Sequence, residues 1–199
     1  MARTTVVGYD GSGAAVAAMR CAARRAADGA RLVVAHAAKV PTEFLETPYY
    51  EKSLEHARER AATVLDQAGA ELPGDTTVET AVLSGPPAQA LVQLARELDA
   101  AEIAVGSRGF GPWRAAALGS TSHALLHESD LPVLVVPRRA VETEARRAGA
   151  EQQDYRRVIE IVLGSRGRGR FRAALGSVSH ALLHEADLPV VVVPGAPRN

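Results

Sequence analysis

The chain has 199 residues, and its 23 basic and 23 acidic side chains leave no net charge. This balance excludes the broad electrostatic attraction that draws a protein to nucleic acid or to a membrane surface, so we expect binding to depend on a discrete site. Cys21 is the single cysteine, which excludes an internal disulfide and favours a reducing compartment. Because no apolar run is long enough to span a bilayer, we expect a cytoplasmic protein.

Apolar strands alternate with amphipathic helical segments along the first two thirds of the chain. The pattern predicts strands at 4–9, 31–37, 103–105 and 133–136, helices at 12–27 and 48–68, a further strand and helix, and a last helix near Ser120. This alternation predicts an α/β fold, with an open, parallel, five-stranded sheet and helices on both faces. In such sheets ligands bind beyond the carboxyl ends of the strands, where the strand order reverses.

Glycines line the segment between the fourth strand and the last helix. Gly106 and Gly109 open it, and nine residues later Gly119 leads into the hydroxyl residues Ser120, Thr121 and Ser122. Glycine lets an oxyanion approach backbone N–H groups, and the start of a helix offers further free N–H groups. The spacing matches neither the Walker pattern nor the tighter glycine pattern of dinucleotide folds. It therefore predicts a different kind of phosphate-binding loop.

This G-x2-G-x9-G-S/T spacing resembles that of the ATP-binding members of the universal stress protein family. The resemblance extends to the strand and acidic turn that end at Asp10, to the strand that ends at Ala37, and to Ser84 before a helix; it covers about residues 3 to 138. It implies a Rossmann-like fold of the adenine nucleotide alpha hydrolase type, with strand order 3-2-1-4-5. The order would reverse between the first and fourth strands, so Asp10 would face the glycine loop across one crevice.

The same resemblance implies ATP as the ligand, accompanied by Mg²⁺ held mainly through phosphates and water. Asp10 and the backbone near Ala37 would contact adenine or ribose, and Val105 would line the pocket. The full set of implied nucleotide-binding residues is Gly8, Asp10, Ala37, Val105, Gly106, Arg108, Gly109, Gly119, Ser120, Thr121 and Ser122.

The last part of the chain repeats an earlier part. Residues 161–194 copy residues 103–137 at roughly three-quarters of positions, with an offset of about 58. The copy is one strand-helix-strand unit, and it has one residue fewer between Gly167 and Gly176, so we doubt that it binds phosphate. We therefore divide the chain into a nucleotide-binding domain (1–138), a charged linker (139–157) and a partial repeat (158–199).

The apolar strands of the repeat must be covered, either by the first sheet beyond its fifth strand or by another chain. Relatives that this chain resembles dimerise through their last strand, which implies a homodimer. Our hypothesis is that the extra unit caps or mimics that dimer edge.

Several residues have simpler structural interpretations. Asp10 could serve only a turn and a helix cap, and Arg108 and Arg114 could be solvated loop charges. His123 and His127 lie four apart, a spacing that could hold a metal, but without a third ligand a packing role is favoured. The Arg/Gly-rich stretch 164–172 resembles RNA-binding segments, although its origin as a copied loop explains the glycines better.

The sequence as a whole predicts an ATP-binding, stress-response regulatory protein with no catalytic residue and no metal site of its own. It would have unknown protein partners and no nucleic-acid or membrane partner. One alternative is an enzyme that hydrolyses ATP or transfers a nucleotidyl group, which would need a base or water-orienting group beyond Asp10 and the loop arginines. The other alternative is a ligand-free interaction module.

Overall fold

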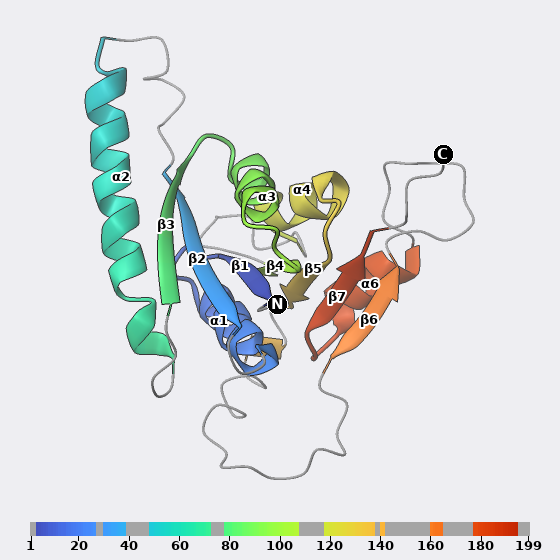
Figure 1. Ribbon diagram of the computed structural model, residues 1–199. Coiled ribbons are helices and arrows are strands. Elements are labelled where there is room, and N and C mark those ends of the chain that lie inside the picture. Colours follow the sequence, from blue (N-terminus) through green and yellow to red (C-terminus); the bar gives the residue numbers. More distant parts are fainter. Residues whose placement is uncertain are drawn as a thin grey trace.

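The computed structural model describes residues 3–26, 30–38, 48–72, 78–107, 118–137, 140–141, 160–164 and 177–194. These residues form a seven-stranded sheet flanked by helices (Figure 1). The strands are β1 (Thr4–Gly8), β2 (Arg31–Ala38), β3 (Val78–Ser84), β4 (Glu102–Gly106), β5 (Val133–Val136), β6 (Ile161–Gly164) and β7 (Val190–Val193). The helices are α1 (Gly13–Arg25), α2 (Tyr50–Asp66), α3 (Pro87–Glu97), α4 (Ser120–Glu128) and α6 (Ser177–Glu185), with a short 3-10 turn at Gly69–Glu71.

Five of the strands form the predicted parallel sheet. Their order is β3-β2-β1-β4-β5, and each neighbouring pair is parallel. The predicted fold class and the reversal of strand order between β1 and β4 are therefore confirmed. The ends of these two strands lie beside each other, because Gly8 is in register with Val105.

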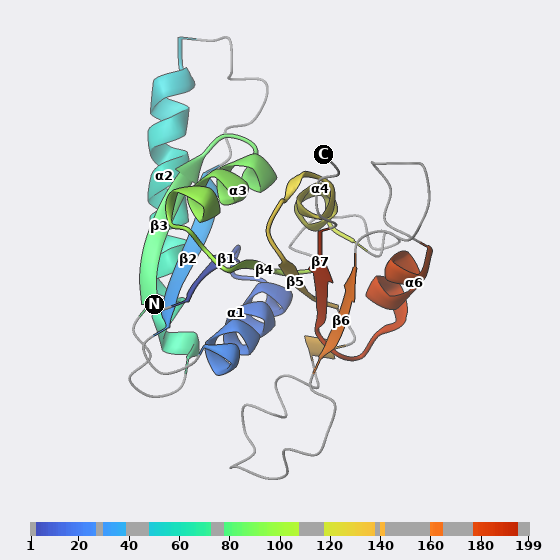
Figure 2. The same ribbon diagram turned by 45° about the vertical axis from the view of Figure 1, so that its right-hand side comes forward.

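Helices cover both faces of the sheet (Figure 2), and an apolar layer lies between the sheet and the helices on each face. On one face, residues of α3 and α4 pack on the sheet, with Ile103 and Leu125 completely buried. On the other face, α1 covers β1, β4 and β5, with Met19 and Leu134 completely buried. Burial of each such side chain contributes about 1.5–3 kcal/mol to the stability of the fold. Both layers therefore hold the strands in fixed positions.

The repeated unit joins the same sheet within the chain. β7 pairs with β5, and β6 pairs with β7, which gives the complete order β3-β2-β1-β4-β5-β7-β6. Of the two docking places that the sequence left open, the structure thus has the unit on its own sheet. The β5–β7 pairing is antiparallel. Apart from Ala140 and Val141, the predicted linker (139–157) lies outside the described residues, and the predicted domain boundaries stay a prediction.

No helix in the described part of the chain is long and apolar enough to cross a membrane.

Candidate functional site

The start of α4 is tied to the end of β4 by two hydrogen bonds. The backbone N–H of Gly119 donates to the carbonyl oxygen of Ser107 at 2.6 Å, and the hydroxyl of Ser122 donates to the carbonyl oxygen of Gly106 at 2.7 Å. Ser122 is buried, so its hydroxyl holds the helix in place rather than facing solvent. The two ends of the glycine-lined loop are thereby brought together as the motif predicts.

The first turn of α4 presents backbone N–H groups. The first hydrogen bond of the helix runs from His123 N–H to the Gly119 carbonyl, and Gly119 in the N-cap position has no side chain to cap the turn. The N–H groups of Ser120, Thr121 and Ser122 precede that bond, and a helix start carries roughly half a positive charge. This end of α4 is therefore suited to an anion.

A second helix start reaches the same point. A Cβ built on Gly106 would lie 2.6 Å from the carbonyl carbon and 2.7 Å from the Cβ of Ala14, in the first turn of α1. Only glycine permits this approach of α1 to the end of β4, because the obstructing backbone and Cβ atoms of Ala14 cannot move aside unless the helix itself moves. The starts of α1 and α4 thus converge on Gly106.

Asp10 lies in the turn that connects β1 to α1. Its Oδ1 accepts the backbone N–H of Ser12 at 3.0 Å, Gly11 adopts a φ of 79°, and the Ser12 hydroxyl caps α1 by accepting the N–H of Ala15. Asp10 thus serves the turn and the start of α1, as the simpler interpretation of the sequence allows. Its side chain is half-buried, at the end of the strand where the sequence predicts a crevice. Its contact with a nucleotide stays a prediction.

Three other predicted residues lie on neighbouring strand ends. A Cβ on Gly8 would lie 2.9 Å from Leu91 of α3 and 2.9 Å from Val105, so glycine here lets β1, β4 and α3 meet. Val105 is buried in the core on that side, and Ala37 is half-buried near the end of β2. Arg108, Gly109 and Arg114 fall outside the described residues.

Two residues near these strand ends were missed by the sequence analysis. The hydroxyl of Ser107, on a residue only 1% exposed, has no hydrogen-bond partner in the described part of the chain. An unpaired buried hydroxyl costs about 1–3 kcal/mol, so this atom is well placed to receive a ligand's oxygen or donor. Its position between Gly106 and Gly109 could have singled it out.

His36 of β2 is the other missed residue. Its Nδ1 lies 2.6 Å from the carbonyl oxygen of Tyr9, which fixes Nδ1 as the protonated nitrogen, and the ring thereby rests on the exit of β1. Burial, helped by the carboxylates of Glu71 and Asp10 and opposed by Arg20, raises the pKa of the Tyr9 hydroxyl above its ordinary value. The Tyr9 hydroxyl is therefore uncharged at neutral pH.

The histidine pair of α4 packs ring against ring. His123 and His127 have ring centroids 4.5 Å apart at a tilt of 51°. Among the described residues no group of three histidine, cysteine or acidic side chains could hold a metal ion.

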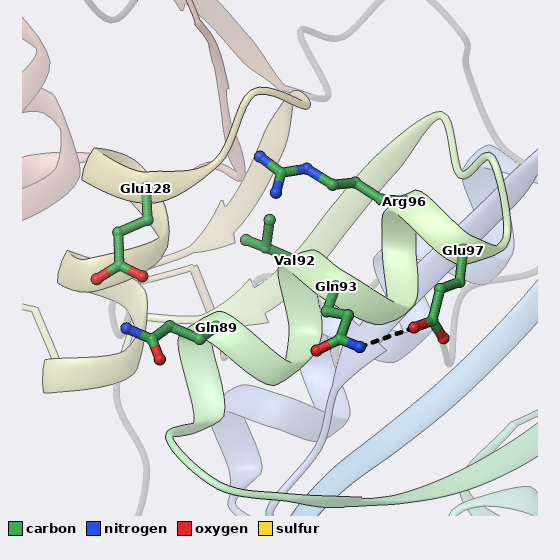
Figure 3. A pocket seen from close by; sticks show the side chains of 6 residues that line it. All are labelled: Gln89, Val92, Gln93, Arg96, Glu97 and Glu128. Carbon is green, nitrogen blue, oxygen red and sulfur yellow. Dashed lines mark hydrogen bonds between the residues drawn. The ribbon is translucent and has the colours of Figure 1, made fainter.

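A cavity of about 430 Å³ lies elsewhere, between α3 and the last turn of α4 (Figure 3). It is lined by Gln89, Val92, Gln93, Arg96, Glu97 and Glu128, and Gln93 donates to Glu97 at 2.9 Å. Glu128 is at the opposite end of α4 from Ser120, about 12 Å away along a nine-residue helix. The cavity is therefore separate from the convergent helix starts.

The chain matches known proteins over most of its length. The model of the universal stress protein family matches residues 1–137 and, separately, residues 139–194. A universal stress protein of Thermus aquaticus, named for the 3′ region of a QAH/OAS sulfhydrylase, is 38% identical over 137 residues, which are 68% of this chain and 99% of that protein. One from Mycolicibacterium smegmatis is 35% identical over 139 residues, 66% of this chain but only 47% of that protein.

A solved universal stress protein from Archaeoglobus fulgidus DSM 4304 is similar over 96% of both chains, with a TM-score of 0.58 and 14% identity, and this likeness supports the fold alone. The family model and the Thermus relative together establish the family of this chain. The chain belongs to the universal stress protein family.

Proposed function

We propose that this chain is a cytoplasmic regulatory protein of the stress response that binds ATP where β1 and β4 end. The observation that carries the proposal is the convergence of two helix starts on Gly106, at the point where the strand order reverses. Open α/β sheets bind ligands at such points, and free N–H groups there favour phosphate.

Most of the predicted residues have a part in this proposal. The N–H groups of Ser120, Thr121 and Ser122 would hold phosphate oxygens, and the unpaired hydroxyl of Ser107 would add a further hydrogen bond. Asp10 and the backbone at Ala37 would contact ribose and adenine. The loop glycines and Arg108 would close over the phosphates, and Mg²⁺ would be held by those phosphates and by water.

We propose a binding function rather than catalysis. Hydrolysis or nucleotidyl transfer needs a positioned base or water-orienting group. Asp10 is the acidic residue that we place at the proposed site, and its Oδ1 already accepts the backbone N–H of Ser12. A purposeful ATPase would turn over with Mg²⁺ and would lose that activity in Asp10→Ala. A regulatory protein would bind without useful turnover in either form.

Gly119→Asp is the sharpest test of the proposed site. At φ −69° and ψ 157° the N-cap residue is in the conformation in which aspartate caps helices, so the variant should be as stable as the parent or more stable by a few tenths of a kcal/mol. The same carboxylate would occupy the N–H groups of α4 and repel phosphate. We expect ATP binding, measured by calorimetric titration with Mg²⁺, to be lost while stability is kept.

Gly119→Ser is the matched control, because it adds a capping hydroxyl without a charge. It should weaken ATP binding much less than Gly119→Asp does. Full binding in the aspartate variant would overturn the site, and an absence of binding in the parent would favour the ligand-free interaction module.

A further inference from the structure

The last hydrogen bonds between β1 and β2 differ in kind. The register of the two strands ends at the pair Gly8 and Ala35, and the Tyr9 N–H still donates to the Ala35 carbonyl at 2.8 Å. The Tyr9 carbonyl, in contrast, accepts a side-chain donor, because the Nδ1 of His36 lies 2.6 Å from its oxygen. A carbonyl can only accept, so Nδ1 carries the proton. His36 thus takes the place of a further backbone donor at the exit of β1.

This bond sets the direction of the next peptide group. β2 and β4 flank β1 on opposite sides (Figure 1), and both bonds of Tyr9 point toward β2. Because a peptide group is planar and trans, a Tyr9 carbonyl that points toward β2 leaves the Asp10 N–H pointing toward β4. β4 ends there at Gly106, one residue beyond the Val105 that is in register with Gly8. The Asp10 N–H therefore faces the point where the starts of α1 and α4 converge.

The Asp10 N–H is unused within the described part of the chain. No acceptor lies within hydrogen-bond distance of it there, whereas the Asp10 carboxylate accepts the Ser12 N–H through Oδ1 at 3.0 Å. If this peptide group turned over, the Tyr9 oxygen would face β4 and would present a partial negative charge to a phosphate. The direction of the Tyr9 carbonyl thus decides whether this peptide group attracts or repels an anion.

We propose that His36 is a positioning residue of the nucleotide site: it holds the Tyr9 carbonyl toward β2, so that the Asp10 N–H donates to the nucleotide. The identity of the ligand rests on the proposed function, whereas the role of His36 rests on this hydrogen bond. The Tyr9 side chain is buried against α1, but packing of a side chain leaves the rotation of its own carbonyl open. The imidazole supplies the restraint that packing lacks.

Three substitutions at His36 separate this role from packing. His36→Asn keeps an N–H donor close to the place of Nδ1, His36→Gln carries its amide further out, near the place of Nε2, and His36→Phe keeps a ring without a donor. The asparagine and glutamine variants differ by one methylene, so a difference between them reports where the donor lies. Urea unfolding checks that each variant is folded.

ATP binding gives the first measurement. The loss of one such hydrogen bond corresponds to about a tenfold change in affinity, so His36→Phe and His36→Gln should bind ATP with Mg²⁺ about tenfold more weakly by calorimetric titration. His36→Asn should recover most of the affinity, to within about threefold of the parent. Parental affinity in His36→Phe, or weaker binding in His36→Asn than in His36→Gln, would overturn the inference.

Amide hydrogen exchange of the ligand-free protein, followed by NMR, gives a second measurement that needs no nucleotide. Because the Ser12 N–H is bonded to Asp10, a loosened peptide before Asp10 should expose it, and its exchange should quicken about tenfold in His36→Phe and His36→Gln but not in His36→Asn. A parent that binds no ATP would overturn the proposed function, and this exchange would still decide the role of His36. Equal exchange rates in the three variants would overturn that role.

Discussion

Two copies of one strand-helix-strand unit lie in the same sheet with different surroundings. All five residues of β4 are buried, whereas β6 alternates, and Val162 is 61% exposed where its counterpart Ala104 is fully buried. The difference comes from the neighbouring elements. β1 pairs with β4 and α1 covers β4, whereas β6 lies at one edge of the sheet that the described residues form. The two copies of the glycine motif thus differ in the strand and helix beside them, and our proposal places the nucleotide only at the copy that has both.

The largest effect should come from filling the contact between β4 and α1. Gly106→Ala places a methyl group 2.6 Å from the backbone of Ala14, and the forced shift of α1 should lower the free energy of unfolding by about 3 kcal/mol. Gly164→Ala changes the exposed counterpart and should cost no more than about 0.5 kcal/mol. Urea unfolding measures both, and equal losses would break the comparison.

The buried ion pair at the other end of β4 should give the next effect. Arg25 bonds to Glu102, whose side chain is 7% exposed, and it also pairs with Glu160 ahead of β6. Arg25→Leu leaves Glu102 buried without its cation and should cost about 2 kcal/mol. Glu160→Gln keeps the inner pair and should cost less than about 1 kcal/mol by the same unfolding assay. The reverse ranking would mean that the contact of Arg25 with Glu160, ahead of the second copy, is the main one.

The equivalent serines offer a closely matched pair. Ser122→Ala leaves the buried carbonyl of Gly106 without its donor and should cost about 1–2 kcal/mol. Ser179 makes the same bond to Gly164 at 3.2 Å, and because Gly164 is exposed, water can replace the hydroxyl in Ser179→Ala. The loss there should be at most about half as large. Thermal unfolding measures both losses. Equal shifts in the melting temperature of the two variants would contradict the predicted difference.

The smallest effect concerns Cys21 in α1, the helix that covers the first copy. Burial raises the pKa of this thiol, with Arg24 and Arg25 acting in the opposite direction. A raised pKa in the folded state means that stability is complete below the thiol's ordinary value of about 8.5 and falls as the pH rises above it, by at most about 1.4 kcal/mol per pH unit. Cys21→Ala should flatten this slope between pH 8 and 10, and an unchanged slope would mean that another group causes it.

The sequence analysis was correct where local patterns decide the structure. Apolar runs and glycine exits predict β1, β2, β4 and β5 within a residue or so, and the glycine spacing predicts that the end of β4 meets the start of α4. The strand order followed from the family resemblance, which supplied what periodicity lacks.

Other features depend on contacts between distant residues. β7 is a run of four valines, and such a run carries no period that indicates a pairing direction, so its antiparallel pairing was not predicted. The approach of Ala14 to Gly106 likewise exists only after α1 has docked on the sheet, and the Ser107 hydroxyl is buried without a partner only in the folded chain.

The central claim is that the first copy binds nucleotide and the second does not, and the stoichiometry of ATP binding tests it most directly. Calorimetric titration of nucleotide-stripped protein with ATP and Mg²⁺ should give one site per chain, lost in Gly119→Asp and kept in Gly176→Asp, which changes the counterpart in the second copy. Two sites per chain, or a site lost only in Gly176→Asp, would contradict the account.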